Sequence, residues 1–129
     1  MRQYDPEQPP NPVEWLALDE QERIQLAEAH HLAARVKLPS TKGHAVVHVI
    51  VENQIAEGRE SVVRAMERLM NEGLSRHDAL HAIGSVLAEH LFEASKTKDK
   101  DFANSAQAHY DAAVERLSAK SWRQDHGVQ

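Results

Sequence analysis

Two pairs of histidines carry the chemistry that this sequence most readily offers. His44 and His48 stand four residues apart, and so do His77 and His81 further along the chain. In a helix, residues four apart project from the same face, about 6 Å apart along the axis, so each pair can offer two neutral imidazoles to one ion. The sequence therefore predicts a metal site that draws two histidines from each of two helices.

Two carboxylates extend these pairs. Glu52 follows His48 by one helical turn on the same face, where it can act as a fifth ligand, as a partner behind a ligand, or as a general base towards bound water. Glu89 lies about 12 Å beyond His81 along its helix, so it shares an ion with His81 only if a second metal is bound. Otherwise Glu89 faces water or forms a buried salt bridge. Both are candidate metal ligands and candidate catalytic groups.

The donor set predicts which ions the site would take. Four imidazoles and a carboxylate suit Zn²⁺ or Fe²⁺, with Ni²⁺ and Cu²⁺ as further candidates, better than Ca²⁺ or Mg²⁺, which prefer oxygen ligands. The chain has no cysteine, which excludes thiolate ligands, disulfides and a cysteine nucleophile. His44 and His77 lie near expected helix N-termini, where the helix dipole disfavours imidazolium and keeps the ring available to a metal.

Four other histidines leave open whether they join the site. His30 and His31 lie on the two faces of the first long helix, and His31 is placed to reach the cluster. His90 falls on the apolar side of its helix and is interpreted as a packing histidine. His109 flanks the apolar stripe of the last helix.

The elements that position the histidines are all expected to be helices. Helical spacing, capping residues and stops predict a short helical turn at Trp15 and long helices at 19–36, 42–57, 59–72, 75–95 and 102–117. The β-branched residues at 46–51 also have strand propensity, but a segment of about sixteen residues is too long for a typical strand. The predicted fold class is therefore all-α, a compact bundle of four to five helices.

The predicted helix at 59–72 runs back between the two histidine helices. We therefore expect these two helices to lie side by side and roughly parallel, with the four imidazoles level. Gly84, Ser85 and Ala88 share the helical stripe of the second histidine pair. Such small residues would let another backbone approach closely.

Length and composition predict one domain. With 129 residues the chain is long enough to bury a single core. Residues 12–119 are expected to form the helical domain. The first twelve residues hold four of the five prolines, so 1–11 are expected to be a flexible lead-in, and 120–129 a flexible tail.

Charge and hydropathy argue against two classes of partner. The net charge is −5 and no run of basic residues occurs, so a nucleic acid is not expected to bind. No apolar run approaches the roughly eighteen residues of a membrane span, and the first residues lack the apolar segment of a signal peptide. We expect no membrane association and a cytoplasmic location.

The stretch 44–92 resembles an uncharacterised bacterial family of small helical domains. The resemblance rests on two H-x3-H pairs, a glutamine, a glutamate and an aromatic residue, here His44, His48, Gln54, His77, His81, Glu89 and Phe92. The resemblance implies a helical fold and makes Gln54 and Glu89 further candidates for functional residues, but it implies no particular activity.

The pattern is also similar to that of hemerythrin-like di-iron bundles, which carry a lone His, HxxxE, HxxxH and HxxxxD on successive helices. The matching residues are His30 or His31, then His48 with Glu52, and His77 with His81. The chain departs from that pattern because an extra helix separates the two middle motifs. In addition, Asp111 follows His109 on a different helical face.

These observations leave three functions open. The first is a small metal-binding protein, which includes the case of a metal-dependent enzyme in which Glu52 or Glu89 transfers a proton. The second is a closed four-histidine site that staples two helices together. The third is a metal-free helical interaction module, most simply a homodimer, whose histidines pack or respond to pH. An open pocket beside the ion favours the first, and a buried ion without a cleft favours the second.

Overall fold

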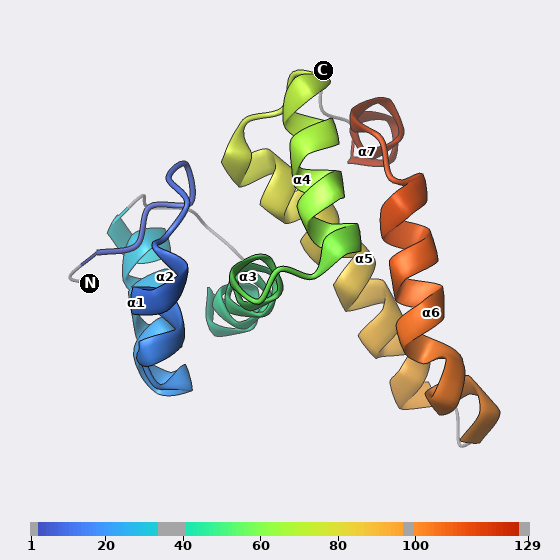
Figure 1. The fold of residues 1–129 in the computed structure, drawn as a ribbon, viewed down its shortest axis with the longest axis horizontal. Helices are drawn as coiled ribbons and strands as arrows, with labels where there is room; N and C mark the ends of the chain where they lie inside the picture. Colours follow the sequence, from blue (N-terminus) through green and yellow to red (C-terminus); the bar gives the residue numbers. More distant parts are fainter. Residues whose placement is uncertain (1–2, 34–40, 97–99, 127–129) are drawn as a thin grey trace.

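The structure is a computed structural model that describes residues 3–33, 41–96 and 100–126 (Figure 1). Over these residues the chain forms an all-α compact bundle without strands, as the sequence predicts. Its helices are α1 (Pro12–Ala17), α2 (Glu20–Ala33), α3 (Thr41–Ala56), α4 (Glu60–Asn71), α5 (Arg76–Lys96), α6 (Lys100–Arg116) and α7 (Ala119–His126). None of the described helices combines the length and the apolar character needed to span a lipid bilayer.

Local signals explain where the helices begin and end. The Asn11 side chain accepts hydrogen bonds from the backbone N–H groups of Val13 and Glu14, which caps α1. Gly58 follows α3 with φ of 76°, and Gly73 follows α4 with φ of 103°, conformations that glycine adopts without steric cost. The predicted helices from residue 42 onward are therefore present, with their ends shifted by two residues at most. Residues 34–36 of the first predicted long helix lie outside the described residues.

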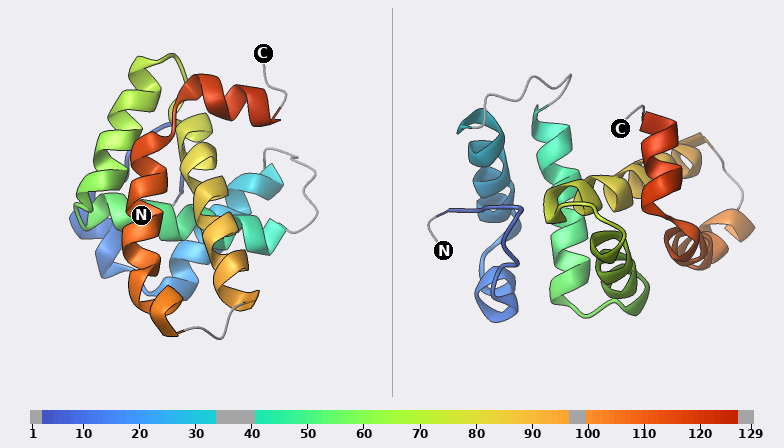
Figure 2. Two further views of the ribbon diagram at one scale, coloured as in Figure 1. Left: turned by 90° about the vertical axis from the view of Figure 1, so that its right-hand side faces the viewer. Right: turned by 90° about the horizontal axis from the view of Figure 1, so that it is seen from above.

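Helix α3 is the central element of the fold. The helices α1 and α2 lie on one side of it and α4 and α5 on the other (Figures 1 and 2). This position explains its apolar sequence, because side chains on opposite faces of α3 pack into two separate clusters. Val49 packs towards α1 and α2, and Val51 packs into the larger cluster.

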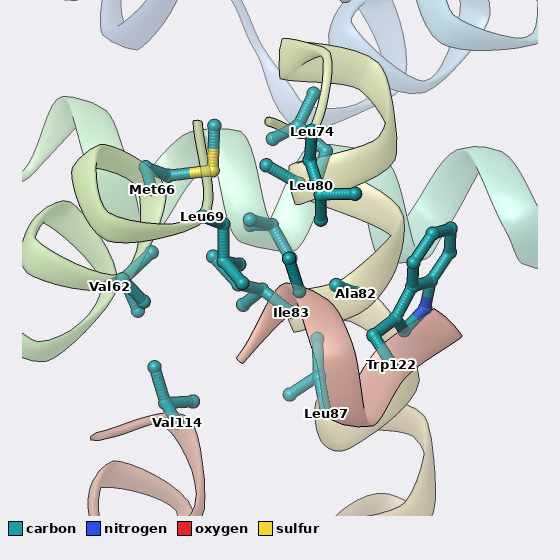
Figure 3. Close-up of a cluster of buried hydrophobic side chains, with 14 of the residues drawn as sticks. Val62, Met66, Leu69, Leu74, Leu80, Ala82, Ile83, Leu87, Val114 and Trp122 are labelled. Atoms are coloured by element: carbon teal, nitrogen blue, oxygen red, sulfur yellow. The ribbon is translucent and has the colours of Figure 1, made fainter. Parts of the chain in front are cut away.

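The larger cluster fills the space between α3, α4, α5, α6 and α7 (Figure 3). Leu69, Leu80 and Ile83 are fully enclosed there, and Trp122 of α7 packs beside α5. Trp122 is only 6% exposed, although residues 120–129 were expected to form a flexible tail. A single aromatic side chain in a polar segment gives no periodic signal, yet its burial is enough to dock a short helix.

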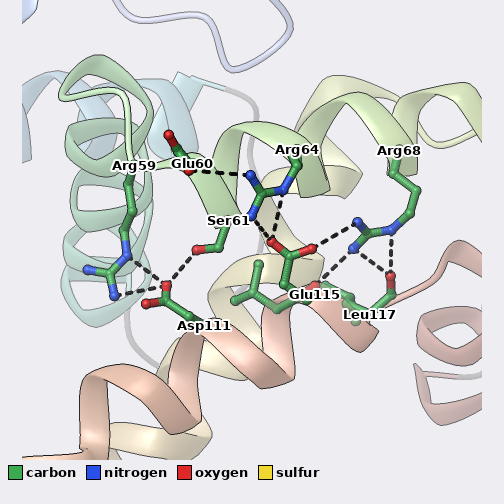
Figure 4. Close-up of polar contacts among 9 residues, drawn as sticks. Arg59, Glu60, Ser61, Arg64, Arg68, Asp111, Glu115 and Leu117 are labelled. Atoms are coloured by element: carbon green, nitrogen blue, oxygen red, sulfur yellow. Dashed lines mark hydrogen bonds and ion pairs between the residues drawn. The ribbon is translucent and has the colours of Figure 1, made fainter.

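Charged side chains hold α6 against α4 at the surface (Figure 4). Arg59 contacts Asp111 at 3.0 Å and Arg64 contacts Glu115 at 2.5 Å. Arg68 donates to the backbone carbonyl oxygens at the end of α6. These contacts fix the outer layer of the bundle, on the side of α4 that faces away from the histidines.

Candidate metal centre

The four paired histidines meet between α3 and α5. The Nε2 atom of His81 lies 2.8 Å from that of His44 and 3.0 Å from that of His48. The ring of His77 meets that of His81 edge to face, with 4.3 Å between ring centroids. One possible ligand atom from each of the four lies within 4.8 Å of the others. The predicted grouping of these histidines is therefore present in the structure.

A crossing of the two helices, rather than a parallel alignment, brings the rings together. Figure 1 looks down the axis of α3 while α5 runs across the view, so the expected parallel arrangement is not found. A Cβ atom on Gly84 would lie 2.7 Å from a methyl carbon of Val47, closer than any side chain allows. The glycine thus permits the close approach of α5 to α3, and the N-terminal halves of both helices meet at the crossing.

Tyr4 determines how His48 presents its ring. The Tyr4 hydroxyl donates to Oε2 of Glu52 at 2.6 Å and lies 3.1 Å from Nδ1 of His48. Burial and the neighbouring Glu52 charge raise the pKa of Tyr4 well above its ordinary value, so the hydroxyl keeps its single proton and donates it in the hydrogen bond to Glu52. Nδ1 of His48 must then be the donor to the hydroxyl oxygen, so the lone pair of the neutral ring is on Nε2, the atom that faces the cluster.

Glu52 lies behind His48 and is held by Arg76. The two nitrogens Nη1 and Nη2 of Arg76 donate to Oε2 and Oε1 of Glu52 at 2.8 and 2.7 Å. Both side chains are buried, with Glu52 1% exposed and Arg76 6%. With Tyr4 as a third donor, both carboxylate oxygens are engaged, and Glu52 is not among the residues whose ligand atoms converge. Of the three roles considered for Glu52, its position matches that of a partner behind a ligand.

The residues before α1 form hydrogen bonds to the start of α5 and so hold Arg76 and His77 in position. The backbone carbonyl of Pro6 accepts from Arg76 at 2.8 Å, and the Glu7 carboxylate accepts from the backbone N–H of His77 at 2.6 Å. The Tyr4 ring is 4% exposed and packs against Trp15. The segment 3–7 therefore contacts both histidine helices, although proline content predicted a flexible lead-in at 1–11.

The protons within the cluster are hard to arrange without a cation. An imidazole nitrogen carries either a proton or a lone pair, so Nε2 of His81 cannot donate to one neighbour and accept from the other. If it accepts from both, His48 carries protons on both nitrogens and is positively charged. If it donates to both, one proton is shared between His44 and His48. A metal ion removes the conflict because every nitrogen then contributes a lone pair.

Other candidate residues lie outside this group. His30 is the nearest, because its ring packs against that of His77 at 5.7 Å between centroids. The side chain of His31 lies outside the part of the chain that is described. Glu89 is exposed on α5 and borders a separate cavity of about 440 Å³ with His90 and His109. The structure therefore does not bring Glu89 to the four histidines.

Gln54, which the resemblance singled out, also points elsewhere. Its side-chain oxygen accepts from the Tyr110 hydroxyl at 2.7 Å, on the side of α3 that faces α6. Sequence reasoning in turn missed Tyr4, Glu7 and Arg76. The one available signal was Glu52 itself, since a carboxylate on a buried helix requires a cationic or donor partner.

A cavity of about 270 Å³ opens beside the histidines. Three of them, His44, His48 and His81, contribute to its wall. The other wall residues are apolar or small: Val47, Leu80, Gly84, Ser85, Ala88 and Trp122. The Ser85 hydroxyl donates to the backbone carbonyl of Ala82 at 2.8 Å. The predicted stripe of small residues thus has two effects. Gly84 lets α3 approach α5 closely, and the small side chains of Ser85 and Ala88 leave room for the cavity.

The fold and this centre define a class, an all-α bundle with four converging histidines and an apolar cavity at their side. Comparison with protein-family models, with curated proteins and with solved structures finds no match.

Proposed function

We propose that the protein binds one transition-metal ion, in the first place Zn²⁺, through His44, His48, His77 and His81. The observation that carries this proposal is the convergence of four imidazoles, together with the hydrogen bond that directs the lone pair of His48 Nε2 into the cluster. Metal-bound histidines commonly donate their second ring nitrogen to a fixed partner in this way.

The spacing of the nitrogens supports an ion with short bonds and few ligands. Zn–N bonds of about 2.0–2.1 Å in a tetrahedron place the nitrogens about 3.3 Å apart. The Nε2 atom of His81 lies 2.8 and 3.0 Å from those of His44 and His48, close to that value, and the four ligand atoms all lie within 4.8 Å of one another. Fe²⁺, Ni²⁺ and Cu²⁺ accept the same donors and are the alternatives that the test includes.

The cavity favours an accessible ion over a purely structural staple. A purely structural metal ion is enclosed by protein on all sides, whereas here three of the four histidines border an open cavity. The ion would therefore be reachable by a small molecule. Glu52 does not act as a base in this proposal, because Arg76 and Tyr4 engage both of its oxygens.

Metal analysis of untagged protein, purified without chelators or immobilised metal, tests the proposal directly. We expect about one ion per chain, or uptake of one Zn²⁺ by the metal-free protein. A Zn²⁺ concentration of 100 times the dissociation constant stabilises the fold by about 2.7 kcal/mol. The double variant His48→Ala, His81→Ala should lose the ion, and His109→Ala, which alters an exposed histidine on α6, should retain it.

Circular dichroism of the double variant shows whether its helices remain. The thermal shift of the wild-type protein provides a measurement that does not depend on any variant. If none of the four ions binds to the wild-type protein or raises its melting temperature, the proposal is wrong, and a metal-free helical module becomes the better interpretation.

A further inference from the structure

The cavity beside the histidines has a composition that selects its occupant. Its wall outside the imidazoles consists of Val47, Leu80, Ala88 and Trp122, with Gly84 and Ser85 as small members. None of the described residues in this wall is acidic or basic apart from the histidines. The Ser85 hydroxyl already donates to a backbone carbonyl. A ligand therefore meets a mostly apolar surface, with no charged side chain among the described wall residues outside the imidazoles and an ion bound by them.

The electrostatics of the centre select the charge of that ligand. A divalent ion held by four neutral imidazoles keeps its two positive charges, since no carboxylate belongs to the converging group within the described chain. The nearby charge of Glu52 is balanced by Arg76 through two hydrogen bonds. In an apolar surrounding an uncompensated cation attracts an anion strongly, because little solvent screens it.

We propose that the cavity binds a small monoanion with an apolar body, whose anionic atom joins the four imidazoles as a fifth ligand of the metal ion. This inference rests on the metal binding proposed above, and it names the class of ligand that the same site takes. The head of the ligand points to the three histidines of the cavity wall, and its body lies against Trp122 and Leu80.

The available space fits a ligand of this class. An apolar cavity of about 150 Å³ is large enough to admit a benzene ring. The cavity here is about 270 Å³, which leaves room for a ring or a short aliphatic chain together with a carboxylate-sized head. Larger ligands would have to displace Trp122 or extend through the opening.

Three small molecules test separately the two properties that the ligand needs, an apolar ring and a negative charge. Benzoate has both the ring and the charge, acetate has the charge without the ring, and benzamide has the ring without the charge. The protein is first loaded with Co²⁺, whose visible absorption bands report the ligands around the ion. We expect benzoate to shift these bands, acetate to require at least a tenfold higher concentration, and benzamide to leave the bands unchanged.

Two alanine replacements provide the matched variants. Ala88→Phe places a ring in the cavity from an exposed position on α5, and Ala108→Phe makes the same change at an exposed position on α6. We expect at least a tenfold loss of benzoate affinity in the first variant and no change in the second. The Co²⁺ bands of each variant without ligand show whether its metal site is intact.

The outcomes separate the two proposals. If Co²⁺ gives no bands and no metal binds, the metal site itself is wrong. If the bands form but benzoate and acetate act at similar concentrations, or if Ala88→Phe responds to benzoate like the wild type, the metal site stands and the ligand pocket is refuted.

Discussion

The hydroxyl group of Tyr4 offers the sharpest test of how the centre is organised. Tyr4→Phe removes one oxygen atom and keeps the ring, which packs against Trp15 with 5.6 Å between centroids. The change removes the donor to Glu52 and the acceptor for Nδ1 of His48. It leaves the two hydrogen bonds between Arg76 and Glu52 in place.

The size of both effects follows from these contacts. A hydrogen bond to a charged group contributes about 1.5–3 kcal/mol, so the metal-free protein should lose about that much stability. For a domain of this length each 1 kcal/mol lowers the melting temperature by roughly 3–5 °C. Loss of a fixed partner behind a ligating histidine typically lowers metal affinity by about 10- to 100-fold. We expect the loss of Zn²⁺ affinity in Tyr4→Phe to lie within that range.

Tyr110→Phe is the matched control. Tyr110 is also buried, its pKa is raised to about 12 by burial, and its hydroxyl donates to Gln54 at 2.7 Å. Its removal should cost stability of about 1 kcal/mol without altering Zn²⁺ affinity. Thermal unfolding in the presence of a chelator measures the first quantity, and competition with a chromophoric Zn²⁺ chelator measures the second.

The reasoning fails if Tyr4→Phe lowers Zn²⁺ affinity no more than Tyr110→Phe does. In that case His48 would keep the correct tautomer without the Tyr4 hydroxyl. A large loss of stability with unchanged affinity would lead to the same conclusion, since the hydroxyl would then serve the fold alone.

Two further predictions concern the bundle around the site. Gly84→Ala places a methyl group 2.7 Å from Val47, so we expect about 1–3 kcal/mol of destabilisation in denaturant unfolding, and an unchanged midpoint would contradict the close crossing. The hydrogen bond from Arg59 holds the pKa of Asp111 below its ordinary value of 3.8, so the ion pair stabilises the fold above that pH and is lost as the pH falls through the lowered pKa. Asp111→Asn should therefore cost about 1 kcal/mol or less at pH 7, and this cost should become smaller as the pH falls through the lowered pKa. A cost that does not change with pH would exclude the ionised carboxylate as its source.

The histidine group was predictable because it depends on local geometry. Residues four apart share a helical face whatever the rest of the fold does, so His44 with His48 and His77 with His81 are fixed once both segments are helical. Gly84 was predictable for the same reason, as a small residue on the stripe of the second pair. What local geometry could not give is the angle at which the helices cross, because packing along their whole length decides it.

The partners of the histidines were not predictable from the sequence. Tyr4 is separated from Glu52 by 48 residues, and Pro6 from Arg76 by 70. No periodicity links residues at such separations, and a segment rich in proline gives no indication of its docking place. The expectation of flexibility at 1–11 followed composition, whereas the observed position follows from the burial of the Tyr4 ring and from three buried hydrogen bonds that Tyr4 and Pro6 make.

The buried pair of Glu52 and Arg76 is explained better by the metal centre than by the stability of the fold. Burying two charges costs several kcal/mol in desolvation, and apolar residues of similar volume stabilise many proteins equally well. An apolar pair, however, would leave the Tyr4 hydroxyl free to donate its proton to His48, which would place the lone pair of that ring on the wrong side. The Glu52 carboxylate instead accepts the hydrogen bond from the Tyr4 hydroxyl, and Arg76 holds both carboxylate oxygens in place. The pair therefore determines which nitrogen of His48 carries the proton, and it leaves the lone pair on Nε2, the atom that faces the cluster.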